Sequence, residues 1–337
     1  MQVIKPTDFA VCVTDYLTKY LAGRRNLSTN TIKSYRDTFC LLLTYLNEEM
    51  HLPVEKVYLK NIDDKVISAF LDWLENERGN SPSTRNVRLA AIHAFFRYVQ
   101  MQHPELLIQC QRILSIELKK TTKKAVNYLS EDTLKNLLSQ PNQNHKYGIR
   151  DTAILCLLYD SGARAQEIID LSIADLRLDA LSTVRLLGKG RKVRIVPIMK
   201  QTAEILRKYL KQWNLNPKTQ PDKPLFVNHK GNRLTRPGLT YILQKYMEQI
   251  PTMSNQKAVT PHIIRHSKAM HLLHADVNLH YIRDFLGHVN IETTELYAKA
   301  DSEMKRKALE KANIDIGGSN ETTWQKDDNL LSWLQSL

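Results

Sequence analysis

Apolar residues recur at spacings of three and four along the first hundred residues, a pattern that restricts this part of the chain to amphipathic helices. The turn sequence Gly-Asn-Ser-Pro at 79–82 is typical of a break between two helices. We therefore predict a compact unit of four helices, with apolar faces at 9–20, 32–46, 67–74 and 87–99.

The helical pattern stops at a basic stretch, KKTTKK, at 119–124. This stretch is polar and has no apolar period, so we expect an exposed linker. The chain has 337 residues, enough for two domains with hydrophobic cores of their own. The sequence thus predicts a helical domain at 1–118, a basic linker at 119–127, a second domain at 128–312 and a carboxy-terminal tail at 313–337.

The second domain combines helices with a few strands. Its pattern begins with a helix start at Ser130 and an apolar helix at 147–159. Helices return after Arg236, and a further short strand is expected at 225–227. The predicted fold class is mainly α with a small antiparallel β-sheet (α+β). Its central element is a β-hairpin around the turn at 188–191, built on Val184, Leu186, Val193, Ile195 and Pro197.

The charge balance favours a polyanionic partner. The chain holds 48 Lys and Arg residues against 35 Asp and Glu residues, a net charge of +13, and such an excess favours nucleic acid. No run of about 18 apolar residues occurs, and Asp8 and Asp15 interrupt the region where a signal peptide needs an apolar core. We expect a soluble, cytoplasmic protein without a membrane partner. The wide spacing of the cysteines favours buried reduced thiols at Cys12, Cys40, Cys110 and Cys156.

Two polar clusters near the middle of the chain are candidates for chemistry. Arg164 follows a glycine at a helix end and has Glu167 three residues on. The pair suits either a surface salt bridge or a phosphate-binding fork. Lys189 lies between two glycines at the hairpin tip, where it forms either an ordinary basic turn or a side chain that enters the groove of a ligand.

The remaining candidates lie in the last third of the chain. His262, Arg265 and His266 occupy positions i, i+3 and i+4, hence one face of a helix. The two histidines have metal-ligand spacing, but an arginine on the same face would repel a cation, so no metal is expected. His288 follows a Leu-Gly turn, and Tyr297 comes nine positions later. Taken alone, such a tyrosine is most often a core or interface residue.

Together, these motifs resemble those of the tyrosine recombinases, also called the phage integrase family. The amino-terminal stretches NLSTNTIKSYRDTF and SPSTRNVRLAAIHAFFRYV are similar to the helical core-binding domain of that family, so the resemblance covers nearly the whole chain. Ala163 and Ile263 depart from the residues common in the family and leave the chemistry intact. The motifs, in the order of the family, are Gly162-Ala163-Arg164 with Glu167, Gly188-Lys189-Gly190, His262-Ile263-Ile264-Arg265-His266, Leu286-Gly287-His288 and the segment that ends in Tyr297.

The resemblance implies a DNA strand transferase that needs no metal, ATP or other cofactor. Tyr297 would attack a scissile phosphate and form a 3′-phosphotyrosine, and strands would be exchanged and rejoined through a Holliday junction. Arg164 and Arg265 would bind the non-bridging oxygens of that phosphate and stabilise the charge of the transition state.

Five further residues receive supporting roles from the same resemblance. Lys189 would protonate the leaving 5′ oxygen, and His262 would act as acid and base. His288 would donate a hydrogen bond to a phosphate oxygen, and Glu167 would hold the group of catalytic side chains in place. His266 is expected to make a structural hydrogen bond on its helix.

The implied architecture is a helical, SAM-like core-binding domain and a catalytic domain that close as a clamp around double-stranded DNA. Four copies would assemble on two recombination sites, with accessory DNA-bending or directionality proteins as further partners. The tail would pack on its own domain or on a neighbouring subunit through Leu330, Trp333 and Leu334. Basic residues that either contact phosphates or form solvated faces are Arg24, Arg25, Lys33, Arg36, Arg85, Arg88, Lys119, Lys120, Lys123 and Lys124.

Several biological roles share this chemistry. We expect integration, excision or transposition of a mobile element, with Xer-like resolution of chromosome or plasmid dimers as the alternative. A DNA-binding protein without catalysis is a second alternative. A relaxing topoisomerase is a third, although the chain is short for one and has no long helical linker between its active-site segments.

Overall fold

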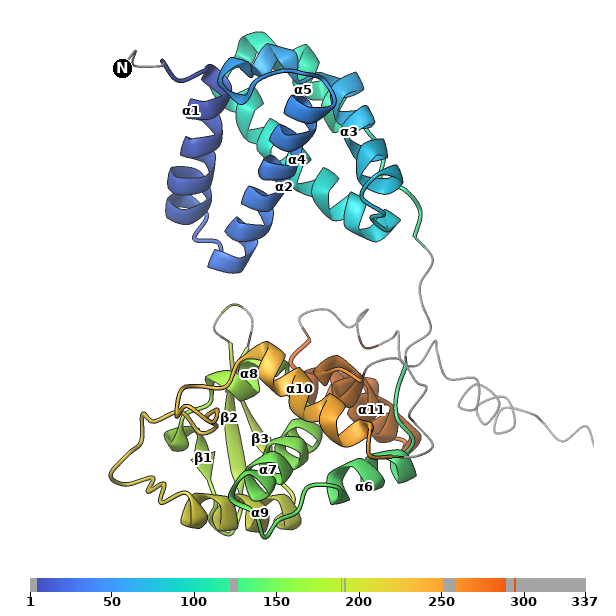
Figure 1. Ribbon diagram of the computed structural model, residues 1–337. Coiled ribbons are helices and arrows are strands. Elements are labelled where there is room, and N and C mark those ends of the chain that lie inside the picture. The colour runs from blue at the N-terminus through green and yellow to red at the C-terminus, as the bar shows by residue number, and fades with distance from the viewer. Residues whose placement is uncertain are drawn as a thin grey trace, which may run out of the picture. The chain divides into compact units, whose positions relative to one another are not determined.

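The computed structural model divides the chain into two compact units, 1–123 and 124–337, each with a hydrophobic core of its own (Figure 1). The mainly α fold with a small antiparallel sheet, predicted from the sequence, is confirmed. In the part of the chain that the structure describes, no helix is long and apolar enough to cross a membrane. The described residues are 5–121, 127–188, 190, 192–250, 259–288 and 294.

The first unit is built from helices. The four predicted helices are present, and a further short helix, α5, was not predicted. Eight residues contain too few turns to give a clear apolar period, and α5 is held in place by the burial of Cys110 and Ile113. The helices are α1 (Asp8–Asp15), which continues as a π-helix (Tyr16–Arg24), α2 (Thr29–Glu48), α3 (Asp64–Asn76), α4 (Pro82–Gln102) and α5 (Leu107–Leu114).

Local sequence explains where these helices begin. Thr7, Ser28, Asp63 and Ser81 precede α1, α2, α3 and α4, and each side chain accepts a hydrogen bond from a backbone N–H of the first turn. Inside the unit, aromatic rings packed around Tyr16 join α2 to α4, which lie side by side in Figure 1.

The second unit consists of helices around a small sheet. Ser130 caps α6, as the sequence pattern predicted, and Pro261 stands at the first position of α11. The helices are α6 (Glu131–Ser139), α7 (Lys146–Ser161), α8 (Ala165–Asp170), α9 (Lys200–Gln212), α10 (Arg236–Met247), α11 (Pro261–His274) and α12 (Leu279–Leu286).

The sheet has the antiparallel order β1-β2-β3, with β1 (Leu176–Arg177), β2 (Thr183–Leu187) and β3 (Val193–Pro197). The predicted hairpin is confirmed as β2 and β3, in a register that pairs Leu186 with Arg194. The prediction of a strand at 225–227 is wrong: this segment forms no strand, and Val227 makes only an isolated bridge to Arg233. The two-residue strand β1 is too short to leave a signal in the sequence.

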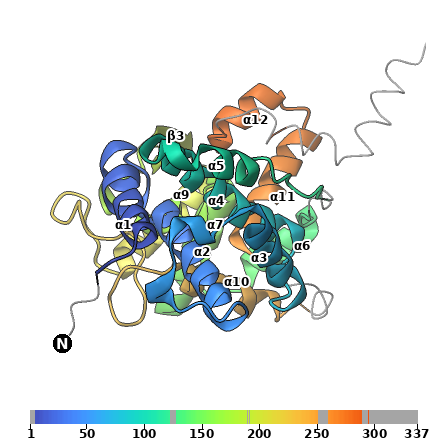
Figure 2. The same cartoon turned by 90° about the horizontal axis from the view of Figure 1, so that it is seen from above.

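Helix α7 lies at the centre of the second unit. It is buried over residues 148–158, with α9 and α11 packed on it. In Figure 2, α12 lies next to α11. Gly162 ends α7 in the left-handed conformation, with φ 55°, so the chain turns sharply into Arg164. This turn places the motif Gly162-Ala163-Arg164 directly after the end of α7.

We expect Gly162→Ala to lower the free energy of unfolding by about 2–4 kcal/mol. A Cβ atom there would lie 2.8 Å from Cδ2 of Leu286 and 3.1 Å from Cε1 of Phe285, in addition to the strain of the positive φ. Gly231→Ala is the matched control, because Gly231 also has a positive φ but no described atom within 4 Å of the added Cβ. Chemical denaturation measures both variants. Equal losses would contradict the close packing at Gly162.

The cysteines follow the prediction with one correction. Cys12, Cys110 and Cys156 are buried and free, but Cys40 is exposed. Helix α2 buries the face that holds Phe39 and Leu42, and Cys40 lies on another side of the same helix. Apolar neighbours in the sequence were therefore not enough to predict whether this thiol is buried.

Candidate active site

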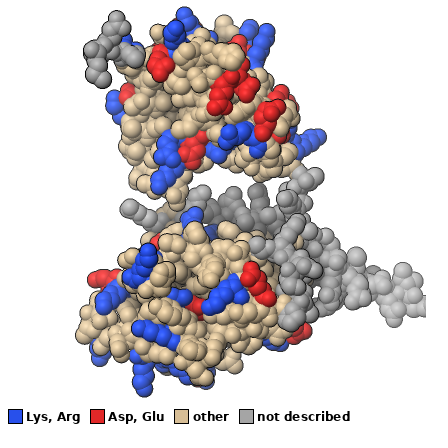
Figure 3. All heavy atoms as spheres, in the orientation of Figure 1, with Lys and Arg blue, Asp and Glu red and all other residues tan. Residues whose placement is uncertain are grey.

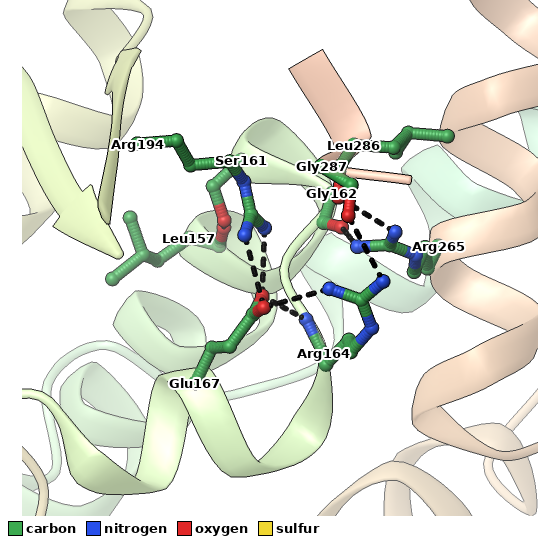
Figure 4. A network of polar contacts seen from close by, with 9 residues as sticks. All are labelled: Leu157, Ser161, Gly162, Arg164, Glu167, Arg194, Arg265, Leu286 and Gly287. Atoms are coloured by element: carbon green, nitrogen blue, oxygen red, sulfur yellow. Dashed lines mark hydrogen bonds and ion pairs between the residues drawn. The ribbon is translucent and has the colours of Figure 1, made fainter. Parts of the chain in front are cut away.

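Arg164 and Glu167 meet at the start of α8. Arg164 is the N-cap residue of this helix, with extended backbone, and its N–H donates to Oε2 of Glu167 at 2.8 Å. Its side-chain Nη1 donates to Oε1 at 2.9 Å. The Glu167 side chain is only 4% exposed, whereas that of Arg164 is 31% exposed. The carboxylate is thus buried, and the guanidinium that it holds is partly exposed. Figure 4 shows the two side chains pointing toward each other.

A third residue, Arg194, belongs to this cluster, and the sequence motifs did not identify it. Its Nη1 and Nη2 donate to Oε1 and Oε2 of Glu167 at 2.9 and 2.6 Å. The hairpin pattern stressed Val193 and Ile195, but these side chains are exposed, and the inward face of β3 carries Arg194 and Val196. The register of the hairpin pairs Arg194 with buried Leu186, which puts Arg194 on the inward face, but no sequence motif linked it to Glu167.

Arg265 on α11 is buried and joins two turns. Its Nη1 donates to the carbonyl of Gly162 at 2.6 Å, and its Nη2 donates to the carbonyl of Leu286 at 2.7 Å. Nη2 of Arg164 donates to the next carbonyl, that of Gly287, at 3.2 Å. Both guanidinium groups therefore meet at the turn that ends α12, directly before His288 (Figure 4).

The charges of this cluster shift the pKa values of their neighbours. Burial raises the pKa of Glu167, but the hydrogen bonds and charge of Arg194, and then those of Arg164, outweigh burial and hold the pKa below its usual value. Burial, followed by the charges of Arg265 and Arg164, lowers the pKa of His288 to about 4. Partial burial and then Arg265 lower the pKa of His262 as well. At pH 7 these groups are a carboxylate and two neutral imidazoles beside three arginine cations.

His266 belongs to the same helix face. Burial, then His262 and Arg265, lowers its pKa. In the described part of the chain, no group of three or more His, Cys, Asp and Glu side chains is arranged to hold a metal ion.

The model of the phage integrase family matches residues 127–304, and the model of the N-terminal SAM-like domain of phage integrases matches residues 14–103. The chain belongs to the phage integrase family. It is a site-specific tyrosine recombinase, as the sequence motifs predicted. The provisionally named integrase/recombinase y4rC of Sinorhizobium fredii is 38% identical over 336 residues, which cover 99% of each chain. The tyrosine recombinase XerC of Syntrophus aciditrophicus is 33% identical over 290 residues, 83% of this chain and 90% of XerC.

Solved structures share the fold of the recombinase. One is the XerH site-specific recombinase bound to its difH substrate, with a TM-score of 0.65 and 24% identity, over 88% of this chain and 83% of XerH. Another is the Tn1549 transposon integrase in complex with transposon right end DNA, with a TM-score of 0.66 and 19% identity, over 89% of this chain and 98% of that one.

The structure brings part of the predicted site of the recombinase together and leaves part outside the described residues. Arg164, Glu167, Arg265 and His288 gather around one turn, and His288 Nδ1 lies 3.0 Å from Oγ1 of Thr294. Gly188, at the start of the hairpin loop, would place a Cβ 3.4 Å from Oε1 of Glu167. Outside the described residues lie Lys189, Tyr297, Lys123, Lys124, Leu330, Trp333 and Leu334.

The basic residues of the first unit differ in how far their side chains are exposed to solvent. The expectation that Arg85 faces outward is wrong, because its side chain is buried beside Glu75, with 3.6 Å between Nε and Oε2. Arg88 is half-buried and donates to the carbonyl of Ser34 and to Thr38 on α2. Charged side chains of both signs mix on the face of this unit that Figure 3 shows. The predicted contacts that are exposed are Arg24, Arg25, Lys33, Arg36, Lys119 and Lys120.

Because the pKa of His288 is low in the folded protein, we expect the free energy of unfolding to fall at acid pH. In the unfolded chain a histidine binds a proton near pH 6.5, whereas folded His288 stays neutral down to about pH 4, so the folded state loses stability as the pH falls between these values. Between pH 7 and 4.5 we expect the free energy of unfolding to fall by about 2 kcal/mol more in the wild type than in His288→Asn. Urea denaturation at both pH values measures this difference, and parallel losses in the two proteins would contradict it.

Proposed function

We propose that this recombinase cleaves DNA by attack of Tyr297 on a scissile phosphate held by Arg164 and Arg265. The observation that carries the proposal is the convergence of the two guanidinium groups on the turn at 286–287. Two cations at one place attract a phosphate and stabilise the extra negative charge of a pentacoordinate transition state. The same field favours the phenolate over the phenol, whose usual pKa near 10 makes it a poor nucleophile at neutral pH.

The proposed reaction exchanges one phosphodiester for another. A bond forms between Oη of Tyr297 and phosphorus, and the bond between phosphorus and the 5′ oxygen breaks, leaving a 3′-phosphotyrosine. His262 takes up the phenolic proton, and Lys189 gives a proton to the leaving 5′ oxygen. Because the energy of the phosphodiester is kept in the protein–DNA bond, rejoining through a Holliday junction needs no ATP.

The remaining residues of the cluster support this reaction. Glu167 accepts two hydrogen bonds from Arg164, which it holds in place, and two more from Arg194. His288 is neutral at pH 7, and we propose that it donates a hydrogen bond from its ring to a phosphate oxygen. His266 is proposed to hold α11 by a structural hydrogen bond. The arginines do the work that divalent metal ions do in other phosphoryl-transfer enzymes, so the proposal includes no metal.

The proposal extends to partners and assembly. The XerH structure contains its difH substrate and the Tn1549 integrase structure contains transposon right end DNA, and we propose double-stranded recombination sites as the substrate of this chain. A core-binding domain at 1–118 and a catalytic domain at 128–312 would close around the duplex. Four copies would synapse two sites in the cytoplasm, helped by accessory proteins. The proposed subunit contacts are Leu330, Trp333 and Leu334, and the proposed phosphate contacts are the exposed basic residues of the first unit and linker.

Mobile-element integration, excision or transposition is the first candidate pathway. It is supported by the integrase/recombinase name of y4rC, which matches 99% of this chain. Xer-like dimer resolution is the second candidate, supported by the 33% identity to XerC over 83% of the chain.

Recombination of a two-site plasmid tests this function. The site is first recovered by selecting random duplexes that bind the full-length protein, and two copies are then placed on one supercoiled plasmid. We expect deletion or inversion products that depend on both sites and disappear in Arg164→Gln. Relaxation of a plasmid without any site would indicate a topoisomerase instead. Tight binding without recombination or cleavage would indicate a DNA-binding protein.

A further inference from the structure

Arg194 is part of the cluster but has no task in the reaction proposed above. Its side chain is only 12% exposed, and its fork reaches both oxygens of Glu167. A buried arginine is costly unless its charge is paired. The bidentate pair with Glu167 therefore fixes where Arg194 lies, and equally fixes the carboxylate.

The two arginines each donate two hydrogen bonds to Glu167, but from different groups. Arg194 occupies both carboxylate oxygens with two guanidinium nitrogens, whereas Arg164 gives Glu167 its backbone N–H and one guanidinium nitrogen, Nη1. Nη2 of Arg164 turns instead to the carbonyl of Gly287 (Figure 4). Arg164 thus keeps part of its fork at the surface of the site.

Removing Arg194 would change this arrangement. Glu167 would lose two of its four described hydrogen bonds and its fully paired cation while remaining buried. Arg164 is the other cation bonded to the carboxylate, so its second guanidinium nitrogen would be drawn toward the vacant oxygen and away from Gly287. Arg164 would then offer a poorer fork to a phosphate.

Arg194 also packs against two other parts of the site. A Cβ on Gly287 would lie 3.1 Å from Nη1 and 3.2 Å from Cδ of Arg194, and a Cβ on Gly188 would lie 3.5 Å from Nη1. The guanidinium therefore lies close to the turn before His288 and to the base of the hairpin loop. A cavity of about 460 Å³ opens beside it, and its lining includes Arg194, Gly188, Gly287 and His288.

We infer that Arg194 is a positioning residue for cleavage: by holding both oxygens of Glu167, it keeps Arg164 aimed at the scissile phosphate. The inference rests on the proposed function for the role of Arg164. It assigns Arg194 no contact with the DNA, so its loss should slow cleavage without weakening binding.

Single-turnover cleavage of a nicked duplex that carries a selected site tests this inference in full-length variants. We expect Arg194→Gln to cleave about 100-fold more slowly than the wild type, with DNA affinity within about threefold. Arg194→Lys keeps the charge but not the fork, so it should recover only part of the loss. The control Arg185→Gln removes an arginine from the adjacent strand, where it pairs with Asp175 on the exposed side, and should cleave within about twofold of wild type.

A second substrate separates positioning from a merely structural role. In a methylphosphonate duplex, a neutral methyl replaces one charged oxygen of the scissile phosphate, so there is less charge for Arg164 to stabilise. The loss in Arg194→Gln should then shrink to about tenfold or less, as it should in Arg164→Gln. An equal loss on both substrates, or cleavage within about threefold of wild type on the phosphodiester, would overturn the inference. Failure of the proposed function would look different, since the wild type itself would form no adduct at Tyr297.

Discussion

Tyr297→Phe is expected to abolish covalent attachment of the recombinase to DNA, with a loss beyond about 10⁴-fold, and to leave DNA affinity within about threefold of wild type. The phenolic oxygen is the atom that bonds to phosphorus in the proposed reaction, and phenylalanine lacks only that atom. Arg164 and Arg265 remain in place to bind the phosphate, so binding has no reason to fall. Denaturing electrophoresis of labelled DNA after incubation measures the adduct, and fluorescence anisotropy measures the affinity.

Tyr281→Phe is the matched control for this prediction. Tyr281 lies on α12, close in sequence to His288, and its side chain is 58% exposed, so it is a solvent-exposed phenol outside the proposed site. Its variant should form the adduct at the wild-type rate. An adduct that persists in Tyr297→Phe and disappears in Tyr281→Phe would place the nucleophile on α12 and contradict the proposed mechanism.

Arg265→Lys is expected to lower both the rate of cleavage and the free energy of unfolding. Lysine keeps the charge, but one ammonium cannot reproduce a planar fork that reaches the carbonyls of Gly162 and Leu286 at the same time. One buried carbonyl would lose its partner, so the free energy of unfolding should fall by about 2–3 kcal/mol. Cleavage should slow by about 10³-fold, because the cation would no longer be fixed opposite the phosphate.

Arg164→Lys provides the contrast. Its side chain is partly exposed and reaches solvent, so the same substitution should slow cleavage by a similar factor but lower the free energy of unfolding by less than about 1 kcal/mol. Urea denaturation and single-turnover cleavage on the same preparations measure both quantities. If Arg265→Lys were as stable as wild type, the two carbonyl contacts would not hold the turns together as the structure indicates.

The sequence alone predicted the parts of the fold that repeat over many residues. Helix α7 and the hairpin of β2 and β3 carry long apolar patterns, and both are present. Helix α5, with eight residues, and β1, with two, are too short for a pattern to show. The apolar run at 225–227 looked like a strand but is buried core without a strand ladder to join, with Leu225 and Phe226 fully buried.

The candidate site was predictable where spacing along the chain fixes spacing in the fold. Arg164 and Glu167 are three residues apart at one helix start, so their contact follows from local geometry. Arg194 meets Glu167 from a different strand, and only the tertiary packing of β3 against α8 reveals the pair. The prediction for Arg85 was wrong for a related reason. A charged residue on a helix is expected on the surface, but Arg85 is buried beside an oppositely charged partner, Glu75, that the sequence pattern does not reveal.

The most direct test of the central claim is to incubate the wild-type recombinase in EDTA with a nicked suicide duplex that carries a selected site, and to map the crosslinked peptide by mass spectrometry. The nick lets a short strand diffuse away after cleavage, so the covalent intermediate accumulates. We expect a metal-independent adduct that joins Tyr297 to the 3′ phosphate of the cleaved strand. An adduct on another residue, an adduct at a 5′ phosphate, or cleavage that requires a divalent metal would contradict it.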